Sequence, residues 1–407
     1  MTTRKIFFIV IALFLLLMLG IAWFYISRSQ ETGVTPNGTS GIFGNLFPFG
    51  QGPAEIPGSG QSTDGSGGEG GSASGVSQKL RQLTSAAVAG AVVFTDANGK
   101  YRVRYVEKAL GHVYEAFEGS NIPERLSNTT VPKVQEALLF SNSTSTILRY
   151  LNADEEGITT FSGVINGGEL IGSFLPQNIR GIASSPTGEL AYIIGNGAGV
   201  DLVTTLPNGS SKTVVISLPT TEWRVMWPST NTLTLTTKPS GESSGFMYSL
   251  NRSTKTLTPM LGNIRGLTGT ANQSLSRVVF AESGEDTITL GQLIIKTGDI
   301  STLPLNTLPA DKCVWSTLSD TVIFCAVPAE IPPGLYPDAW YQGLVSFADN
   351  IWEIDLESGN ATLLGILEDG SGAPIDVIEP FISEGDRHFF FKNKKDSTLW
   401  SLQLTDN

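Results

Sequence analysis

Five basic residues recur along this chain at a spacing in the forties. Each stands near the start of an apolar or β-branched run, in the local sequences PKVQ, IRGI, WRVM, IRGL and DKCV. Like charges that gather in one ring repel each other unless carboxylates or carbonyl groups neutralise them. The pattern therefore predicts either ion-paired structural contacts between repeats or an anion-binding mouth for carboxylate, phosphate or sulfate groups of a glycan. The five residues are Lys133, Arg180, Arg224, Arg265 and Lys312.

A second candidate site is the segment Val327–Asn350, which holds four prolines and several aromatic residues. Prolines disfavour regular strands, and long loops on a rigid scaffold often carry binding function. Aromatic rings with polar neighbours are used by carbohydrate and peptide grooves, so Tyr336, Trp340 and Tyr341 are candidate ligand contacts. The alternative is that the loop folds back and its aromatic rings plug the surface of the domain.

The chain has two cysteines, Cys313 and Cys325, and they flank the turn sequence STLSD. In an antiparallel hairpin centred on Ser319 the two residues lie opposite each other, at a separation that a disulfide can bridge. We predict a structural disulfide, with two buried free thiols as the alternative.

Motifs of common catalytic sites are not present in the sequence. It has no H-E-x-x-H, Walker, G-x-S-x-G or C-x-x-C motif, and its two histidines, His112 and His388, fall in expected strands. The sequence therefore predicts no catalytic residue, no metal site and no cofactor. The alternative hypothesis of an enzyme requires an acid–base pair near the basic residues, such as Glu136 or Glu379 with Arg180.

These side chains must be positioned by a repeated unit. Each unit has an inner run, a turn of Ser, Pro, Asn, Asp or Gly, a continuous apolar run and a hairpin. Repetition of four strands at such a period is typical of a β-propeller. We predict an all-β, seven-bladed β-propeller over residues 79–407, with six or eight blades if one boundary is wrong. The units start near Ala86, Lys133, Arg180, Trp223, Arg265, Lys312 and Asp376.

The last unit, Ile378–Leu404, has only three strand-like runs. A short run before the first unit, Lys79–Thr84 (KLRQLT), has no unit of its own. Pairing it with the last blade closes the ring and removes an exposed sheet edge.

Two segments carry a family resemblance. SPTGELAYIIG and FISEGDRHFFFKNKKDSTLWSLQL resemble the WD-repeat-like propeller units of the TolB type, although Thr187 stands where that pattern usually has Asp. The resemblance implies a propeller fold, whose hosts mostly bind other molecules, and the fold alone does not specify the partner.

The N-terminal part predicts a membrane anchor. Residues 6–26 form an uncharged apolar run long enough to span a bilayer, and Arg4 and Lys5 precede it. We expect residues 1–5 in the cytoplasm, a signal anchor at residues 6–26, a flexible Gly/Ser/Pro-rich linker at residues 27–78 and an extracytoplasmic propeller. A cleaved signal peptide is the alternative. An extracytoplasmic location also favours oxidation of the cysteines.

The net charge of −12 argues against nucleic acid as a partner, because an acidic surface repels phosphate backbones. The expected function is a membrane-tethered binding or scaffolding module at the cell envelope, with a protein or glycan partner. The alternative is an envelope hydrolase or lyase with its site at the channel mouth, and a purely structural assembly factor is a third possibility.

Overall fold

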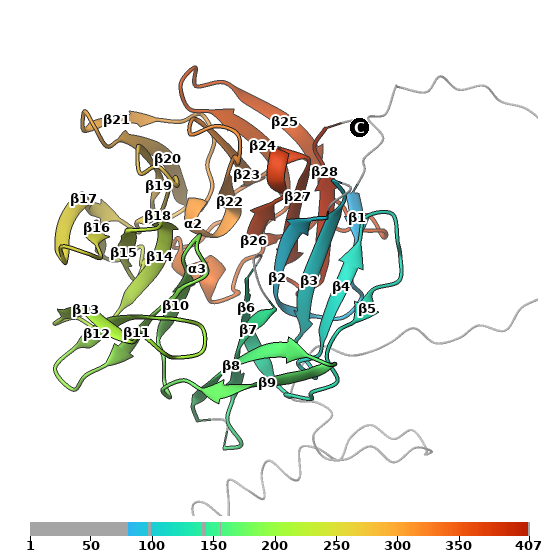
Figure 1. Cartoon of the computed structure of the whole chain (residues 1–407). Coiled ribbons are helices and arrows are strands. Elements are labelled where there is room, and N and C mark those ends of the chain that lie inside the picture. The colour runs from blue at the N-terminus through green and yellow to red at the C-terminus, as the bar shows by residue number, and fades with distance from the viewer. Residues whose placement is uncertain (1–79, 97–98, 141–143, 155, 406–407) are drawn as a thin grey trace, which may run out of the picture. The chain divides into compact units, whose positions relative to one another are not determined.

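The computed structural model describes residues 80–96, 99–140, 144–154 and 156–405. Within these residues the strands form seven four-stranded antiparallel sheets, arranged as the blades of a β-propeller (Figure 1). The predicted all-β, seven-bladed architecture is therefore confirmed. The inner strands begin at or just after the predicted unit starts.

The first four blades follow one another along the chain, each from its inner to its outer strand. Blade 1 holds β2 (Val88–Thr95), β3 (Tyr101–Glu107), β4 (Val113–Phe117) and β5 (Glu124–Arg125); blade 2 holds β6 (Val134–Leu139), β7 (Ser145–Leu151), β8 (Ile158–Asn166) and β9 (Glu169–Phe174). Blade 3 holds β10 (Gly181–Ser184), β11 (Leu190–Gly195), β12 (Val200–Thr205) and β13 (Thr213–Leu218); blade 4 holds β14 (Trp223–Ser229), β15 (Thr232–Thr237), β16 (Ser244–Asn251) and β17 (Thr256–Arg265).

The last three blades include two short helices, α2 (Pro309–Lys312) and α3 (Asp338–Tyr341), and a 3₁₀ turn, η1 (Glu384–Asp386). Blade 5 holds β18 (Thr268–Ala271), β19 (Arg277–Gly284), β20 (Thr287–Ile294) and β21 (Asp299–Thr302); blade 6 holds β22 (Cys313–Trp315), β23 (Val322–Pro328), β24 (Asp349–Asp355) and β25 (Ala361–Ile366). Blade 7 holds β26 (Val377–Ile382), β27 (His388–Asn393), β28 (Leu399–Gln403) and β1 (Leu80–Gln82).

The ring closes through β1, which supplies the outer strand of blade 7. Leu80 pairs with Leu402 and Gln82 with Trp400 in an antiparallel register, and Figure 1 shows β1 beside β28. The predicted closure by the segment before the first unit is thus confirmed, with Lys79 outside the described residues. Closure leaves β28 paired on both sides, so the edge that an open sheet would expose is covered.

Apolar side chains between neighbouring blades form the core. Ala191 of blade 3 packs in one cluster with Val225 and Leu235 of blade 4. Val88 of blade 1 shares a cluster with Phe390 of blade 7. The second strands β11, β23 and β27 bury side chains on both faces, which explains the continuous apolar runs at these places in the sequence.

No helix among the described residues is long and apolar enough to cross a membrane. The expected cytoplasmic segment, signal anchor and linker, residues 1–78, lie outside the described residues.

Candidate functional site

A cavity of about 1370 Å³ runs through the channel of the ring. The inner strands β10, β14, β18, β22 and β26 contribute to its wall, and α2 and α3 lie near the centre of the ring (Figure 1). The cavity exceeds the roughly 300–1,000 Å³ typical of pockets for drug-sized ligands. Its volume is suited to a chain-like ligand or several ligand units.

Arg224 anchors one wall of this cavity. Its guanidinium forms a two-pronged ion pair with Asp311, at 2.8 Å to Oδ1 and 3.1 Å to Oδ2, and donates to the carbonyl of Ala310 at 3.1 Å. Burial alone would lower the pKa of Arg224, but Asp311 and the Tyr341 hydroxyl raise it above its ordinary value. The side chain therefore stays charged, and its charge is matched by one carboxylate.

The Tyr341 hydroxyl completes this wall. It donates to Asp311 Oδ2 at 2.6 Å and accepts from Arg224 Nη1 at 3.3 Å. Burial first, and Asp311 second, raise the pKa of Tyr341 well above its ordinary value, so the phenol stays protonated and donates. The residue as a whole is 39% exposed and lines the cavity.

Arg180 lies at the same mouth in a looser arrangement. Its guanidinium is 3.8 Å from the carboxylate of Glu222, and the ammonium of Lys238 is 3.2 Å from the same carboxylate. All three side chains line the cavity and are well exposed. Since 3.8 Å exceeds a direct hydrogen bond, Arg180 and Glu222 are not hydrogen-bonded to each other, and one oxygen atom placed beside the pair can bond to both.

Two further carboxylates of the cavity are ion-paired. Glu136 pairs with Arg149, and both line the wall. Glu379 also lines it and pairs with Lys392 at 2.7 Å. The side chains that line the cavity therefore include equal numbers of cations and carboxylates, namely Arg149, Arg180, Arg224 and Lys238 with Glu136, Glu222, Asp311 and Glu379.

Trp223 is the aromatic residue of β14 at this mouth. Its Nε1 donates to the Thr220 carbonyl at 3.1 Å, and its ring meets Tyr248 edge to face at 6.0 Å. These two contacts fix the ring while part of it stays exposed to the cavity. Neither Trp223 nor Asp311 is among the site residues predicted from the sequence. Each directly precedes one of them in the chain, Trp223 before Arg224 and Asp311 before Lys312.

The five predicted basic residues do not form one ring. Only Arg180 and Arg224 line the cavity. Arg265 is the last residue of β17, an outer strand, and its Nε donates to the Gly241 carbonyl. Lys133 precedes β6 with a φ of 61° and lies outside the cavity wall.

Lys312 differs most from the expectation, because its side chain is fully buried. The ammonium contacts Asp349 and lies 2.8 Å from both Asp376 Oδ1 and the carbonyl of Val377. The carboxylates are as buried as the lysine, at 0% exposure. Lys312 is thus an internal ion-pair partner between blades 6 and 7 and cannot reach a ligand at the surface.

The three aromatic residues predicted as ligand contacts in the insertion lie in different environments. Tyr336 and Trp340 are buried, at 0% and 2% exposure, and both stack on Phe347. Trp340 Nε1 donates to the carboxylate of Asp376 at 3.0 Å. Two of the three predicted contacts therefore plug the domain, and Tyr341 alone faces the cavity.

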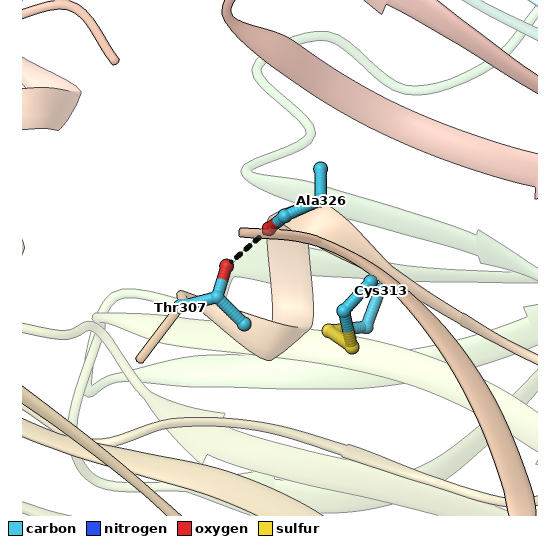
Figure 2. Close-up of a disulfide and its surroundings, with 4 residues drawn as sticks. Thr307, Cys313 and Ala326 are labelled. Carbon is cyan, nitrogen blue, oxygen red and sulfur yellow. Dashed lines mark hydrogen bonds between the residues drawn. A yellow bond between two sulfur atoms is a disulfide. The ribbon is translucent and has the colours of Figure 1, made fainter. Parts of the chain in front are cut away.

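Cys313 and Cys325 stand opposite each other on β22 and β23 and form a disulfide, with their Cα atoms 4.1 Å apart (Figure 2). Figure 2 also shows the hydrogen bond from the Thr307 hydroxyl to the Ala326 carbonyl. Its donor–acceptor distance is 2.5 Å. Cys313 borders the cavity, so the bridge holds the start of β22 against β23 where the mouth is built.

Metal-ligating side chains do not converge in the described part of the chain. Among residues 80–405 outside the short gaps, no cluster of three or more His, Cys, Asp or Glu side chains could hold a metal ion. His112 lies against Thr130 and Arg125, and neither it nor His388 borders the cavity.

No family model matches the chain, and no curated protein matches it. Solved structures similar to it include oligogalacturonate lyase from Vibrio parahaemolyticus (TM-score 0.55, 9% identity, 82% of this chain and 95% of that chain). An oligogalacturonate lyase in complex with manganese follows (0.52, 11%, 81% and 98%). The GH74 xyloglucanase from Xanthomonas campestris is also similar (0.53, 14%, 81% and 54%).

TolB from Acinetobacter baumannii is a more distant match (0.41, 9%, 67% and 62%). At these identities the likeness to the two lyases and the xyloglucanase extends to the fold alone. The described residues do not fit a metal site, so no chemistry is derived through the manganese named for one lyase.

Proposed function

We propose that this protein is a non-catalytic binding module whose partner enters the channel mouth beside Trp223, Arg224 and Tyr341. The observation that carries the proposal is the large cavity itself, which gathers two fixed aromatic rings and several ion-paired side chains at one end of the ring. Concave sites with convergent polar groups are the default ligand sites of rigid scaffolds. Tethered at the cell envelope through residues 6–26, such a module would present this mouth to an envelope protein or glycan.

A binding function is favoured over hydrolase or lyase activity because the carboxylates of the cavity are held in ion pairs. A general acid or base must exchange a proton with a substrate. Glu136 and Glu379, the two candidates from the sequence, are engaged with Arg149 and Lys392. Each of these carboxylates is thus held in place by a cation of the chain, as suits a fixed hydrogen-bond acceptor.

Site-specific photo-crosslinking in intact cells tests the proposal. A photo-reactive side chain replaces Thr221, which is exposed and borders the cavity, in the full-length chain. The control places the same side chain at Ser301, an exposed residue of the outer strand β21. We expect a discrete crosslinked product from position 221 only. Equal products from both positions, or none from position 221, would refute a partner in the channel.

A further inference from the structure

The channel presents cations, yet the side chains that line the cavity include as many carboxylates as cations. Arg224 is held by Asp311, and Arg180 and Lys238 share Glu222. An anionic ligand would have to displace one of these carboxylates and leave it beside a second negative charge. Displacement of a close, partly buried partner such as Asp311 is costly, because the partner loses its stabilisation in a region of low dielectric. The balanced charges therefore disfavour an anionic ligand.

Two aromatic side chains border the same cavity as these pairs. Trp223 comes from β14 and Tyr341 from α3, and the Tyr341 hydroxyl accepts a hydrogen bond from Arg224. Trp223 is fixed by Thr220 and Tyr248, and Tyr341 by Asp311, so neither ring loses much freedom when a ligand packs on it. Rigid aromatic faces bind flat apolar patches such as the C–H faces of sugar rings.

The polar groups of the mouth distinguish hydroxyl groups from peptide groups. Arg180 and Glu222 place a donor and an acceptor 3.8 Å apart. A hydroxyl donates and accepts at one oxygen atom, so it can bridge two such groups. A trans peptide unit carries its N–H and C=O on opposite edges and cannot satisfy both neighbours at once. A ligand with many hydroxyl groups uses this arrangement better than a polypeptide does.

From these observations we infer that the channel mouth binds an uncharged oligosaccharide, stacked on Trp223 and Tyr341 with hydroxyl groups bridging Arg180 and Glu222. The inference rests on the proposed function and specifies its ligand class. It replaces the anionic glycan suggested by the row of basic residues, because the structure pairs Arg180 and Arg224 with carboxylates. The cavity, at about 1370 Å³, has room for more than one sugar unit.

Calorimetric titration of the full-length chain in detergent tests the inference. The neutral probes are cellohexaose, maltohexaose and the hexamer of N-acetylglucosamine; the anionic probe is hexagalacturonic acid, and the peptide probe is a mixed decapeptide library. We expect a neutral probe to bind with a Kd that is insensitive to salt, because no net charge is neutralised. Trp223→Ala and Tyr341→Ala should each weaken that binding about tenfold.

Two further variants separate the alternatives. Phe246→Ala is a matched control, because Phe246 is also 39% exposed but lies on β16, away from the cavity. It should leave the Kd unchanged. Glu222→Gln keeps an acceptor oxygen and removes the charge that opposes Arg180 and Lys238. Neutral binding should not strengthen in this variant, whereas anion binding would strengthen about tenfold if the basic side chains were the true site.

The titrations and the crosslinking have three distinguishable outcomes. A neutral probe that binds and depends on both aromatic rings supports the inference. Preferred binding of hexagalacturonic acid, or of peptides alone, overturns the ligand class and leaves the binding function standing. Absence of any channel-dependent binding, together with no crosslink from position 221, overturns both.

Discussion

Replacement of Lys312 by methionine is the sharpest test of the internal structure. The ammonium is fully buried between Asp349 and Asp376 and also lies over the faces of Trp340 and Phe347, with ring centroids 4.8 Å and 5.1 Å away. One cation therefore serves two buried carboxylates that belong to different blades. Lys312→Met keeps an unbranched side chain, one atom shorter, that fills most of the same space, and it removes the charge and the hydrogen bonds.

The expected loss is ~4 kcal/mol of unfolding free energy at neutral pH, because removal of one partner from a buried ion pair costs roughly 3–5 kcal/mol. Part of the loss is limited by protonation of Asp349. Burial raises the pKa of this carboxyl to about 6, against the lowering effect of Lys312, so loss of the lysine raises the pKa further. The variant should therefore regain stability relative to the wild type as the pH falls.

Urea unfolding of the full-length chain, followed by tryptophan fluorescence, measures the change. Lys296→Met is the control, since Lys296 is exposed, and it should stay within ~0.5 kcal/mol of the wild type. The double variant Lys312→Met with Asp349→Leu should be more stable than Lys312→Met, because Asp376 retains Trp340 as a donor. If Lys312→Met unfolds within about 1 kcal/mol of the wild type, the assigned role of the cluster is wrong.

Three further predictions concern closure, the disulfide and pH. Replacing Cys313 and Cys325 by alanine should cost ~3 kcal/mol, as expected for a loop of this separation, and should abolish any effect of reductant on the melting temperature. Deleting residues 79–84 should unfold the ring because β28 loses its partner strand, whereas deleting residues 32–77 should leave the circular dichroism spectrum unchanged. Because the pKa of Asp349 is raised from 3.8 to about 6, its contribution to stability is present below about pH 4 and is lost as the pH rises through about 6. Asp349→Asn should flatten the melting temperature over this range, and an unchanged profile would contradict the assignment.

The architecture was accessible from sequence because strand alternation, turn residues and a repeat period reinforce one another. The middle strands of a propeller blade can be buried on both faces, and such strands have continuous apolar sequences such as HFFFKN. The missing outer strand of the last blade was equally predictable, since a unit that holds three of its four strands requires the fourth from elsewhere in the chain. Both features follow from the local residue pattern and from the need to close the ring, so the sequence alone predicts them.

The site was only partly accessible, because side-chain partners come from distant segments. Alignment by charge placed Arg265 on an inner strand, yet the inner strand of blade 5 begins at Thr268 and Arg265 ends the strand before it. For Lys312, no local pattern shows that Asp349 and Asp376 converge on it from later strands. A row of like charges therefore predicts equivalent positions along the chain, and it does not predict which of them face solvent.

The insertion in blade 6 connects the buried ion cluster to the channel mouth through two adjacent residues. Trp340 is held inside by Asp376, the carboxylate that also holds Lys312, and Tyr341 is the next residue of the same short helix. The position of the Tyr341 ring at the mouth is therefore fixed from within the core as well as by its own hydroxyl contact with Asp311. A ligand that stacks on a ring held from both sides meets a preformed surface, which lowers the entropy cost of binding. From the sequence, a loop that plugs the domain and a loop that binds a ligand were alternatives. In the structure the insertion does both, because Trp340 is buried in the core and the adjacent Tyr341 lines the cavity.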